Sequence, residues 1–212
     1  MEDTFRDKGL RAQMVEDLKS KGIDNPQLLE AFHAIPRHFF VPESLYGHAY
    51  ADRALPIACN QTISQPYTVA IQTQLLEVRK NNRILEIGTG SGYQAVILKK
   101  MGAYVYTIER QKYIHDETKK LFEILGFNIA SKYGDGYMGW TEFAPYDGIV
   151  ITCGAAEVPQ TLLKQLKIGG VLVVPIGEGV QTMTKIVRES ETSYKTTTHG
   201  VFRFVPMLED KV

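Results

Sequence analysis

A glycine-rich turn is the strongest chemical signal in the sequence. Gly88, Gly90 and Gly92 alternate directly after the apolar run Arg83–Ile87 and before a stretch typical of a helix. Glycine lets a backbone turn sharply and approach a ligand closely, and open α/β sheets bind ligands at the carboxyl ends of their strands. The turn therefore predicts a site for a nucleotide-like cofactor, although glycine spacing alone also fits an ordinary tight turn.

An acidic residue beside this turn indicates which cofactor the site would take. Glu86 precedes the first glycine, and the spacing is G-x-G-x-G. A dinucleotide pyrophosphate is instead seated by G-x-G-x-x-G at the N-terminus of a helix. Because a carboxylate attracts an ammonium group and repels phosphates, we expect S-adenosylmethionine, which carries an ammonium group and no phosphate.

Two further acidic residues follow predicted strands. Glu109 directly follows the predicted strand at 104–108, roughly 20 residues after the glycines. A carboxylate at this position can accept hydrogen bonds from ribose hydroxyls. Asp135 lies between two glycines after a third predicted strand and could meet the adenine amino group. Taken singly, Glu109 also fits an exposed charge at a strand end, and Asp135 also fits an ordinary turn.

A polar loop at 55–67 carries the other candidate group. Ser64 lies near its end, directly before Gln65 and the proline that starts a predicted helix. Ser64 or Gln65 could serve as the N-cap of that helix, because N-cap side chains accept hydrogen bonds from the first backbone N–H groups. The Ser64 hydroxyl could alternatively have a functional role.

The segments that position these residues alternate between strand-like and helix-like patterns. This alternation is typical of βαβ units in a mostly parallel sheet that is covered on both faces. A hairpin of two later strands would close one edge of this sheet. We expect strands at 83–87, 104–108, 128–133, 148–152, 171–174, 182–188 and 196–205, with helices at 93–101, 111–125 and 159–166.

The residues before this alternation predict a helical extension. Apolar spacing indicates a helix near 10–18, a second helix from Pro26 to the stop at Pro36, and a third from Pro66. No linker separates this part from the rest, so we expect one domain over 1–212. Its parts would be the extension with the polar loop at 1–79, the cofactor-binding core at 80–180 and C-terminal strands at 181–212, which contribute to the substrate site.

Composition excludes several classes of protein. The 212 residues hold 24 basic and 24 acidic side chains, without a basic tail, which argues against nonspecific nucleic-acid binding. Cys59 and Cys153 lie far apart and form no metal-binding or disulfide framework. No signal peptide and no run of roughly 20 apolar residues is found. We therefore expect a soluble, cytoplasmic chain with no nucleic-acid, membrane or metal partner.

The sequence resembles the protein-L-isoaspartate (D-aspartate) O-methyltransferase family. Its glycine turn is shared by many methyltransferases, whereas the segments QTIS and FVPM are specific to this family. The resembling segments are LPIACNQTISQPYTVA at 55–70, RILEIGTGSGYQAVIL at 83–98, YGDGYMGW at 133–140, APYDGIVITCGAAEVPQTLLKQLKIGGVLVVPIG at 144–177 and FRFVPM at 202–207.

This resemblance implies a fold and a reaction. The fold would be the doubly wound, Rossmann-like sheet of seven strands found in S-adenosylmethionine-dependent methyltransferases. The reaction would transfer a methyl group to the free α-carboxylate of L-isoaspartyl and D-aspartyl residues in damaged proteins and peptides, leaving S-adenosylhomocysteine and starting repair through a succinimide. A carboxylate with a reference pKa of about 4 is ionised at neutral pH, so no general base is needed.

The resemblance also assigns site residues by their position in these motifs. Ser64 would be the catalytic residue, and Phe204, Val205 and Pro206 would join it in binding substrate along a C-terminal strand. The cofactor site would comprise Gln61, Thr62, Ile63, Ser64, Tyr67, Glu86, Gly88, Thr89, Gly90, Ser91, Gly92, Glu109, Arg110, Asp135 and Gly136.

One departure and three alternatives remain. The family usually has glycine where this chain has Ala58 and Asn60, which predicts a different loop shape and peptide preference. A small-molecule O-methyltransferase or a non-enzymatic cofactor-binding module would share the glycine turn. The presence of the segments near Ser64 and Val205 argues against both. A nucleic-acid methyltransferase would show a basic surface.

Overall fold

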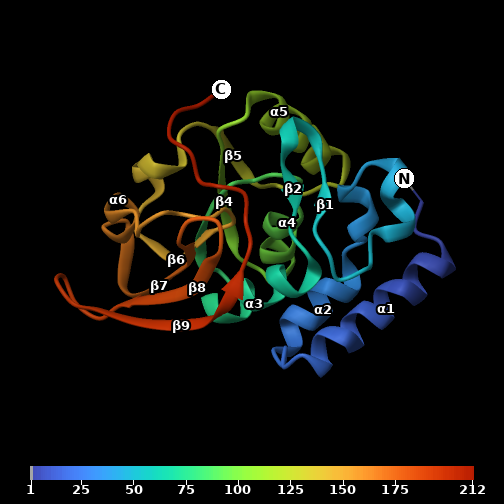
Figure 1. The fold of residues 1–212 in the computed structure, drawn as a ribbon, viewed down its shortest axis with the longest axis horizontal. Coiled ribbons are helices and arrows are strands. Elements are labelled where there is room, and N and C mark those ends of the chain that lie inside the picture. Colours follow the sequence, from blue (N-terminus) through green and yellow to red (C-terminus); the bar gives the residue numbers. More distant parts are fainter. Residues whose placement is uncertain (1) are drawn as a thin grey trace.

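A seven-stranded sheet forms the centre of the computed structural model, which describes residues 2–212 (Figure 1). The strand order is β5-β4-β3-β6-β7-β8-β9. The first five strands pair parallel, β8 pairs antiparallel with β7, and β9 pairs antiparallel with β8. The mostly parallel sheet and the C-terminal hairpin are thereby confirmed. The strands are β3 Arg83–Ile87, β4 Tyr104–Glu109, β5 Ala130–Tyr133, β6 Tyr146–Ile151, β7 Leu166–Ile176, β8 Gln181–Arg188 and β9 Tyr194–Phe202.

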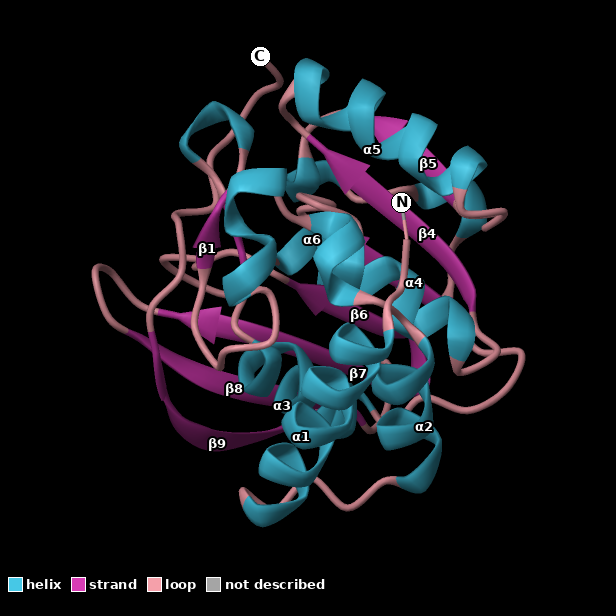
Figure 2. Ribbon diagram, turned by 90° about the vertical axis from the view of Figure 1, so that its right-hand side faces the viewer, coloured by secondary structure: helices cyan, strands magenta, loops and turns pink. Residues whose placement is uncertain are grey.

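Helices cover both faces of the sheet. Figure 2 shows α5 alongside β4 and β5, which it contacts. In Figure 1 the two helices of the N-terminal extension, α1 and α2, lie to the right of the sheet. The helices are α1 Phe5–Ser20, α2 Pro26–Ala34, α3 Pro66–Leu76, α4 Tyr93–Lys100, α5 Lys112–Ile124 and α6 Gln160–Leu163.

Alternate residues of the central strands enter two separate cores. Ile84 and Val150 belong to the core that also contains the apolar residues of α1 to α4, whereas Leu85 and Ile149 face α6. This division follows from the pleat of a strand, which points successive side chains to opposite faces. The extension therefore shares one apolar core with the α/β body. Phe32 of α2, for example, packs edge-on against Tyr93 of α4 with ring centroids 5.9 Å apart.

Several expected elements differ from the observed ones. The strand expected at 171–174 is the eleven-residue β7, and the strand expected at 128–133 begins only at Ala130. The helix expected at 159–166 is only the four residues of α6, because Leu166 already begins β7. The strand expected at 196–205 ends at Phe202. Beyond it, Gly154 donates its N–H to the Val205 carbonyl at 2.8 Å and accepts one from the Met207 N–H at 2.7 Å. This segment therefore pairs with the loop after β6 instead of continuing β9.

Short elements shape the polar loop before α3. Two-residue strands β1 Leu55–Pro56 and β2 Thr62–Ile63 pair antiparallel. Between them lies the 3-10 turn η3 Ala58–Asn60, in which Cys59 and Asn60 have φ values of 55° and 57°. Ala58 itself avoids the left-handed region. The remaining 3-10 turns are η1 Arg37–Phe40, η2 Glu43–His48, η4 Gly136–Met138 and η5 Thr141–Phe143.

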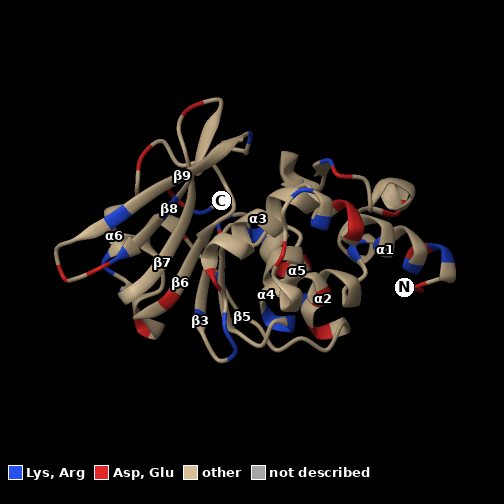
Figure 3. Ribbon diagram, turned by 90° about the horizontal axis from the view of Figure 1, so that it is seen from below, with Lys and Arg blue, Asp and Glu red and all other residues tan. Residues whose placement is uncertain are grey.

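Charges of both signs are distributed over the strands and helices (Figure 3). This distribution agrees with the equal numbers of basic and acidic residues. Within residues 2–212, no helix combines the length and the apolar character that crossing a bilayer requires.

Candidate cofactor and substrate site

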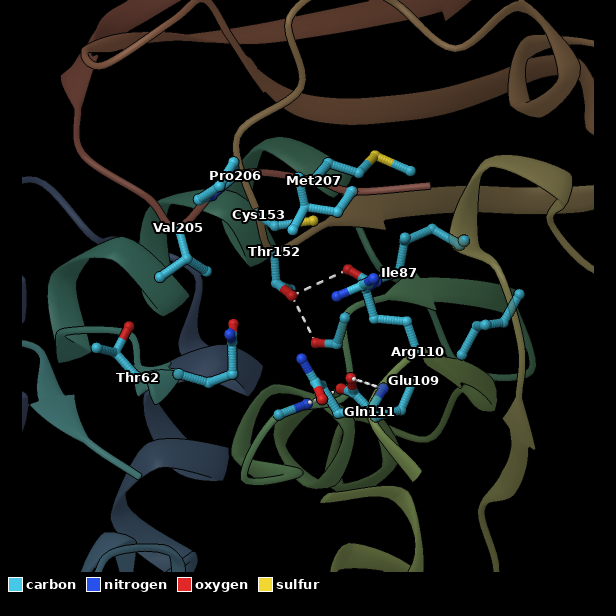
Figure 4. A pocket seen from close by; sticks show the side chains of 16 residues that line it. Thr62, Ile87, Glu109, Arg110, Gln111, Thr152, Cys153, Val205, Pro206 and Met207 are labelled. Carbon is cyan, nitrogen blue, oxygen red and sulfur yellow. Dashed lines mark hydrogen bonds between the residues drawn. The ribbon is translucent and has the colours of Figure 1, made fainter. Parts of the chain in front are cut away.

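A cleft lies at the carboxyl ends of β3 and β6. The chain leaves β3 for β4 on one side and later returns to β6 on the other, so these two strands flank the topological switch point of the sheet. The open space is about 650 Å³. Figure 4 shows side chains from separate elements that point into it. The lining residues are Gln61, Thr62, Ile87, Gly88, Gly90, Ile108, Glu109, Arg110, Gln111, Gly136, Thr152, Cys153, Val205, Pro206, Met207 and Leu208.

Two glycines of the turn, Gly88 and Gly92, leave no room for a side chain. A Cβ on Gly88 would lie 2.6 Å from Thr152 Oγ1, and one on Gly92 would lie 2.6 Å from the Phe122 ring. Both glycines have positive φ, 93° and 83°. Close packing and left-handed geometry together therefore explain why glycine is needed at these positions.

Glu109 is held in the cleft by backbone groups. Its Oε2 accepts the N–H of Gly90 and its Oε1 accepts the N–H of Gln111, both at 2.9 Å. Each carboxylate oxygen can accept more than one hydrogen bond. Glu109 is thus oriented by the glycine turn and can still accept hydrogen bonds from hydroxyls of a ligand.

Glu86 faces a second cavity, which adjoins the cleft and shares Thr62, Gly88, Gly90 and Thr152 with it. We call this second cavity the serine chamber. Its full lining is Thr62, Ile63, Ser64, Val69, Glu86, Gly88, Thr89, Gly90, Ser91, Tyr93, Gln94 and Thr152.

A chain of hydroxyl groups holds one oxygen of Glu86. Thr107 donates its single hydroxyl proton to Glu86 Oε2 at 2.5 Å. The Thr89 hydroxyl, whose oxygen lies 2.6 Å from Thr107 Oγ1, must therefore donate to Thr107. Glu86 is fully buried, and its Oε1 has no hydrogen-bond partner among the described residues. Burial raises the pKa of Glu86 to about 8; the Thr107 hydrogen bond opposes this rise, and the charge of Glu109 adds to it. An ammonium group at Oε1 would supply both the missing hydrogen bond and a compensating charge, so the site fits the cofactor predicted from the sequence.

Ser64 lines the serine chamber, and its hydroxyl is free. Within residues 2–212 its side chain forms no hydrogen bond. Gln65 occupies the N-cap position of α3 without a side-chain bond, and the first turn is capped instead by Asp52, whose Oδ1 accepts the N–H of Tyr67 at 2.8 Å. The N-cap interpretation of Ser64 is therefore wrong.

The sequence matches the family model described as protein-L-isoaspartate(D-aspartate) O-methyltransferase over residues 10–212. The chain belongs to this family. It is 52% identical to the protein-L-isoaspartate O-methyltransferase of Christiangramia forsetii over 212 residues, and 53% identical to that of Flavobacterium johnsoniae over 214 residues. In both comparisons the full length of each chain is covered.

Solved structures agree with this assignment. A protein-L-isoaspartate O-methyltransferase structure with 31% identity superimposes with a TM-score of 0.85, covering 92% of this chain and 65% of that chain. A second structure, a protein of Plasmodium falciparum crystallised with S-adenosyl-L-homocysteine, is 23% identical and gives a TM-score of 0.83 over 94% of this chain and 99% of that chain. The first supports the family and the second supports the fold. The chain is an S-adenosylmethionine-dependent protein-L-isoaspartate O-methyltransferase.

Most of the residues predicted for the methyltransferase site line the cleft or the serine chamber. The exceptions are Tyr67, Gly92, Asp135 and Phe204. Tyr67 stacks on Phe202 with ring centroids 6.4 Å apart, and Phe204 donates its N–H to Gln181 Oε1.

Two of the predicted cofactor residues of the methyltransferase hold its C-terminal segment. Asp135 accepts the N–H groups of Tyr137 and Asp210 at 2.8 and 3.2 Å. Arg110 lines the cleft but donates to the carbonyls of Glu209 and Asp210. The segment that carries Met207 and Leu208 is thereby held against the cleft.

Several lining residues of the methyltransferase site were not predicted from the sequence. Thr152 and Cys153 follow β6, and their position at a strand end was a usable signal. Burial raises the pKa of the Cys153 thiol to about 12. Gln94 and Met207 lie in the resembling segments at 83–98 and 202–207 but were assigned no role, and Leu208 had no signal. Only the folded chain brings these side chains to the site.

Proposed function

We propose that Ser64 orients the free α-carboxylate of L-isoaspartyl and D-aspartyl residues in damaged proteins and peptides for methylation. The observation that carries this role is the Ser64 hydroxyl, which lies in the serine chamber and has no hydrogen-bond partner within residues 2–212. A hydroxyl in that state can donate to a carboxylate at no cost to the fold.

The other residues would position the cofactor and exclude water. When bound, S-adenosylmethionine supplies an electrophilic sulfonium methyl group. Glu86 would bind the ammonium group, Glu109 the ribose, and Gly136 would border the adenine. Val205 and Pro206 would contact the peptide from the segment that pairs with Gly154.

No proton has to be removed from the substrate, because an α-carboxylate is ionised at neutral pH. The contribution of the protein is then orientation and removal of water from two oppositely charged reactants, which together can lower the barrier by several kcal/mol. This explains why the mechanism needs no paired histidine and carboxylate.

We propose the partners and location that the sequence analysis predicted. These are damaged proteins and peptides as substrates, no nucleic-acid, membrane or metal partner, and a cytoplasmic location, with 1–212 acting as one domain. Asp3, Asp7 and His38 could form a metal site, because one potential ligand atom of each lies within 4.8 Å of those of the other two. Asp3 pairs with Arg11, and both ring nitrogens of His38 are hydrogen bonded, so existing contacts account for this cluster.

A single labelling experiment tests the proposed function. The chain is incubated with radiolabelled S-adenosylmethionine and two peptides of identical sequence, one with an aspartyl and one with an isoaspartyl linkage. We expect label only in the isoaspartyl peptide and its loss on mild base treatment, because methyl esters hydrolyse readily. Labelling of both peptides, or of neither, would contradict the proposal.

A further inference from the structure

We propose that Gln94 is a further binding residue for the cofactor, whose α-ammonium group donates a hydrogen bond to Gln94 Oε1. This inference rests on the methyl-transfer function proposed above. It adds a contact that the sequence motifs did not indicate, on the first turn of α4, directly behind the glycine turn.

The orientation of the Gln94 amide follows from its neighbour. Gln94 Nε2 lies 2.6 Å from Thr73 Oγ1, and the Thr73 hydroxyl donates to the Val69 carbonyl at 2.7 Å. Because the single proton of Thr73 is already used, Thr73 can only accept from Gln94. The amide NH₂ must therefore face Thr73, and the carbonyl Oε1 faces away from it.

Two buried acceptors consequently lack donors in the serine chamber. Gln94 Oε1 and Glu86 Oε1 have no hydrogen-bond partner among the described residues, and both side chains line this chamber. Gln94 is 6% exposed and Glu86 is 0% exposed. Leaving such groups unpaired costs free energy, so the arrangement favours an occupant that donates at least two hydrogen bonds.

The chemistry of these acceptors decides between the two reactants. A substrate carboxylate carries only acceptors, so Gln94 Oε1, itself an acceptor, could not bind it. An ammonium group carries three donors and a positive charge. The acceptor side of the serine chamber therefore matches the cofactor, while Ser64, a donor, lies in the same chamber for the substrate.

The test compares two ligands by calorimetry. One is S-adenosylhomocysteine and the other is its analogue in which hydrogen replaces the α-amino group. In Gln94→Met, which keeps the length of the side chain and removes the acceptor, we expect about tenfold weaker binding of S-adenosylhomocysteine, as for a lost hydrogen bond to a charged group. Binding of the desamino analogue should change less than twofold. Equal changes for both ligands, or none for either, would overturn the proposal.

Gln72→Met is the matched control. Gln72, on α3, is likewise a buried glutamine whose Oε1 has no hydrogen-bond partner among the described residues. Unlike Gln94, it lines neither the cleft nor the serine chamber. We expect this variant to keep the wild-type ratio of the two affinities. A fall in this ratio as large as in Gln94→Met would assign the effect to altered packing and overturn the proposal.

A conservative variant covers the case in which Gln94→Met does not fold. Gln94→Glu keeps an acceptor of the same length, so its preference for S-adenosylhomocysteine over the desamino analogue should equal or exceed that of the wild type. A lower preference would count against the contact. Failure of the proposed function would look different, because the wild-type chain would then not label isoaspartyl peptide at all.

Discussion

The carboxylate of Asp52 accepts the backbone N–H of Tyr67 at 2.8 Å and thereby caps α3 from a position 15 residues earlier in the chain. Its second oxygen pairs with Lys21 at 2.5 Å. Residues of the N-terminal extension thus hold the start of the helix that follows Ser64. Because they satisfy the helix end, the serine hydroxyl remains free for a ligand.

Replacing Asp52 should loosen this helix start. We expect Asp52→Ala to lower the free energy of unfolding by about 1 kcal/mol, the usual effect of losing an N-cap, and to lower activity because Ser64 is less well positioned. Chemical denaturation and peptide methylation measure the two effects. Asp24→Ala is the control, since Asp24 is exposed and its carboxylate forms no hydrogen bond within residues 2–212. Equal stability of the two variants would contradict the prediction.

Ser64→Ala should separate turnover from cofactor binding. We expect kcat on an isoaspartyl peptide to fall roughly 10- to 100-fold, the range for a lost hydrogen bond to a charged group. The affinity for S-adenosylhomocysteine and the melting temperature should stay close to the wild-type values, because the hydroxyl bonds to no other described residue. Unchanged kcat would remove Ser64 from the catalytic role.

Glu109→Gln should weaken cofactor binding and the glycine turn together. Both carboxylate oxygens accept backbone N–H groups, and an amide offers only one acceptor atom. We expect about tenfold weaker binding of S-adenosylhomocysteine by calorimetry and a loss of about 1–3 kcal/mol in stability. Glu123→Gln, at an exposed site of α5, is the control and should change neither quantity. Wild-type affinity in Glu109→Gln would exclude the ribose contact.

Glu86→Gln should alter how stability depends on pH. Burial raises the pKa of Glu86 to about 8 in the folded chain, above the reference value of about 4.3 for unfolded glutamate. Between these two values the native state keeps a proton that the unfolded state has released, so the contribution of Glu86 to stability decreases as pH rises. We therefore expect Glu86→Gln to gain stability relative to the wild type from pH 5 to pH 8. Denaturation curves with a pH-independent difference would contradict this.

Arg110→Ala should speed release of the cofactor product. The guanidinium group donates to two carbonyls of the C-terminal segment, which lines the cleft with Met207 and Leu208. Losing two hydrogen bonds of about 1 kcal/mol each predicts dissociation of S-adenosylhomocysteine up to about 30 times faster, measurable by stopped-flow displacement. Lys119→Ala, at an exposed position of α5, should leave the rate unchanged. An unchanged rate in Arg110→Ala would show that this segment does not limit release.

Local patterns predicted most of the fold. The expected strand at 83–87 has the bounds of β3, and the helix expected at 111–125 differs from α5 by one residue at each end. These elements depend on apolar spacing and on turn residues nearby in the sequence. The short α6 and the early end of β9 were not predicted, because they depend on pairing with distant segments, such as that of Val205 with Gly154.

The sequence by itself determined which chemical groups meet at the carboxyl edge of the sheet: the glycines, Glu86 and Glu109. Only the tertiary structure decided which of these groups stay free to bind. Asp135 is predicted from its turn, and only the folded chain shows that its carboxylate also accepts the N–H groups of Tyr137 and Asp210. Gln94 lies in the resembling segment at 83–98 without an assigned role, yet its Oε1 lacks a donor among the described residues. A polar atom is free only if none of its neighbours in space satisfies it, and most of those neighbours are distant in the chain.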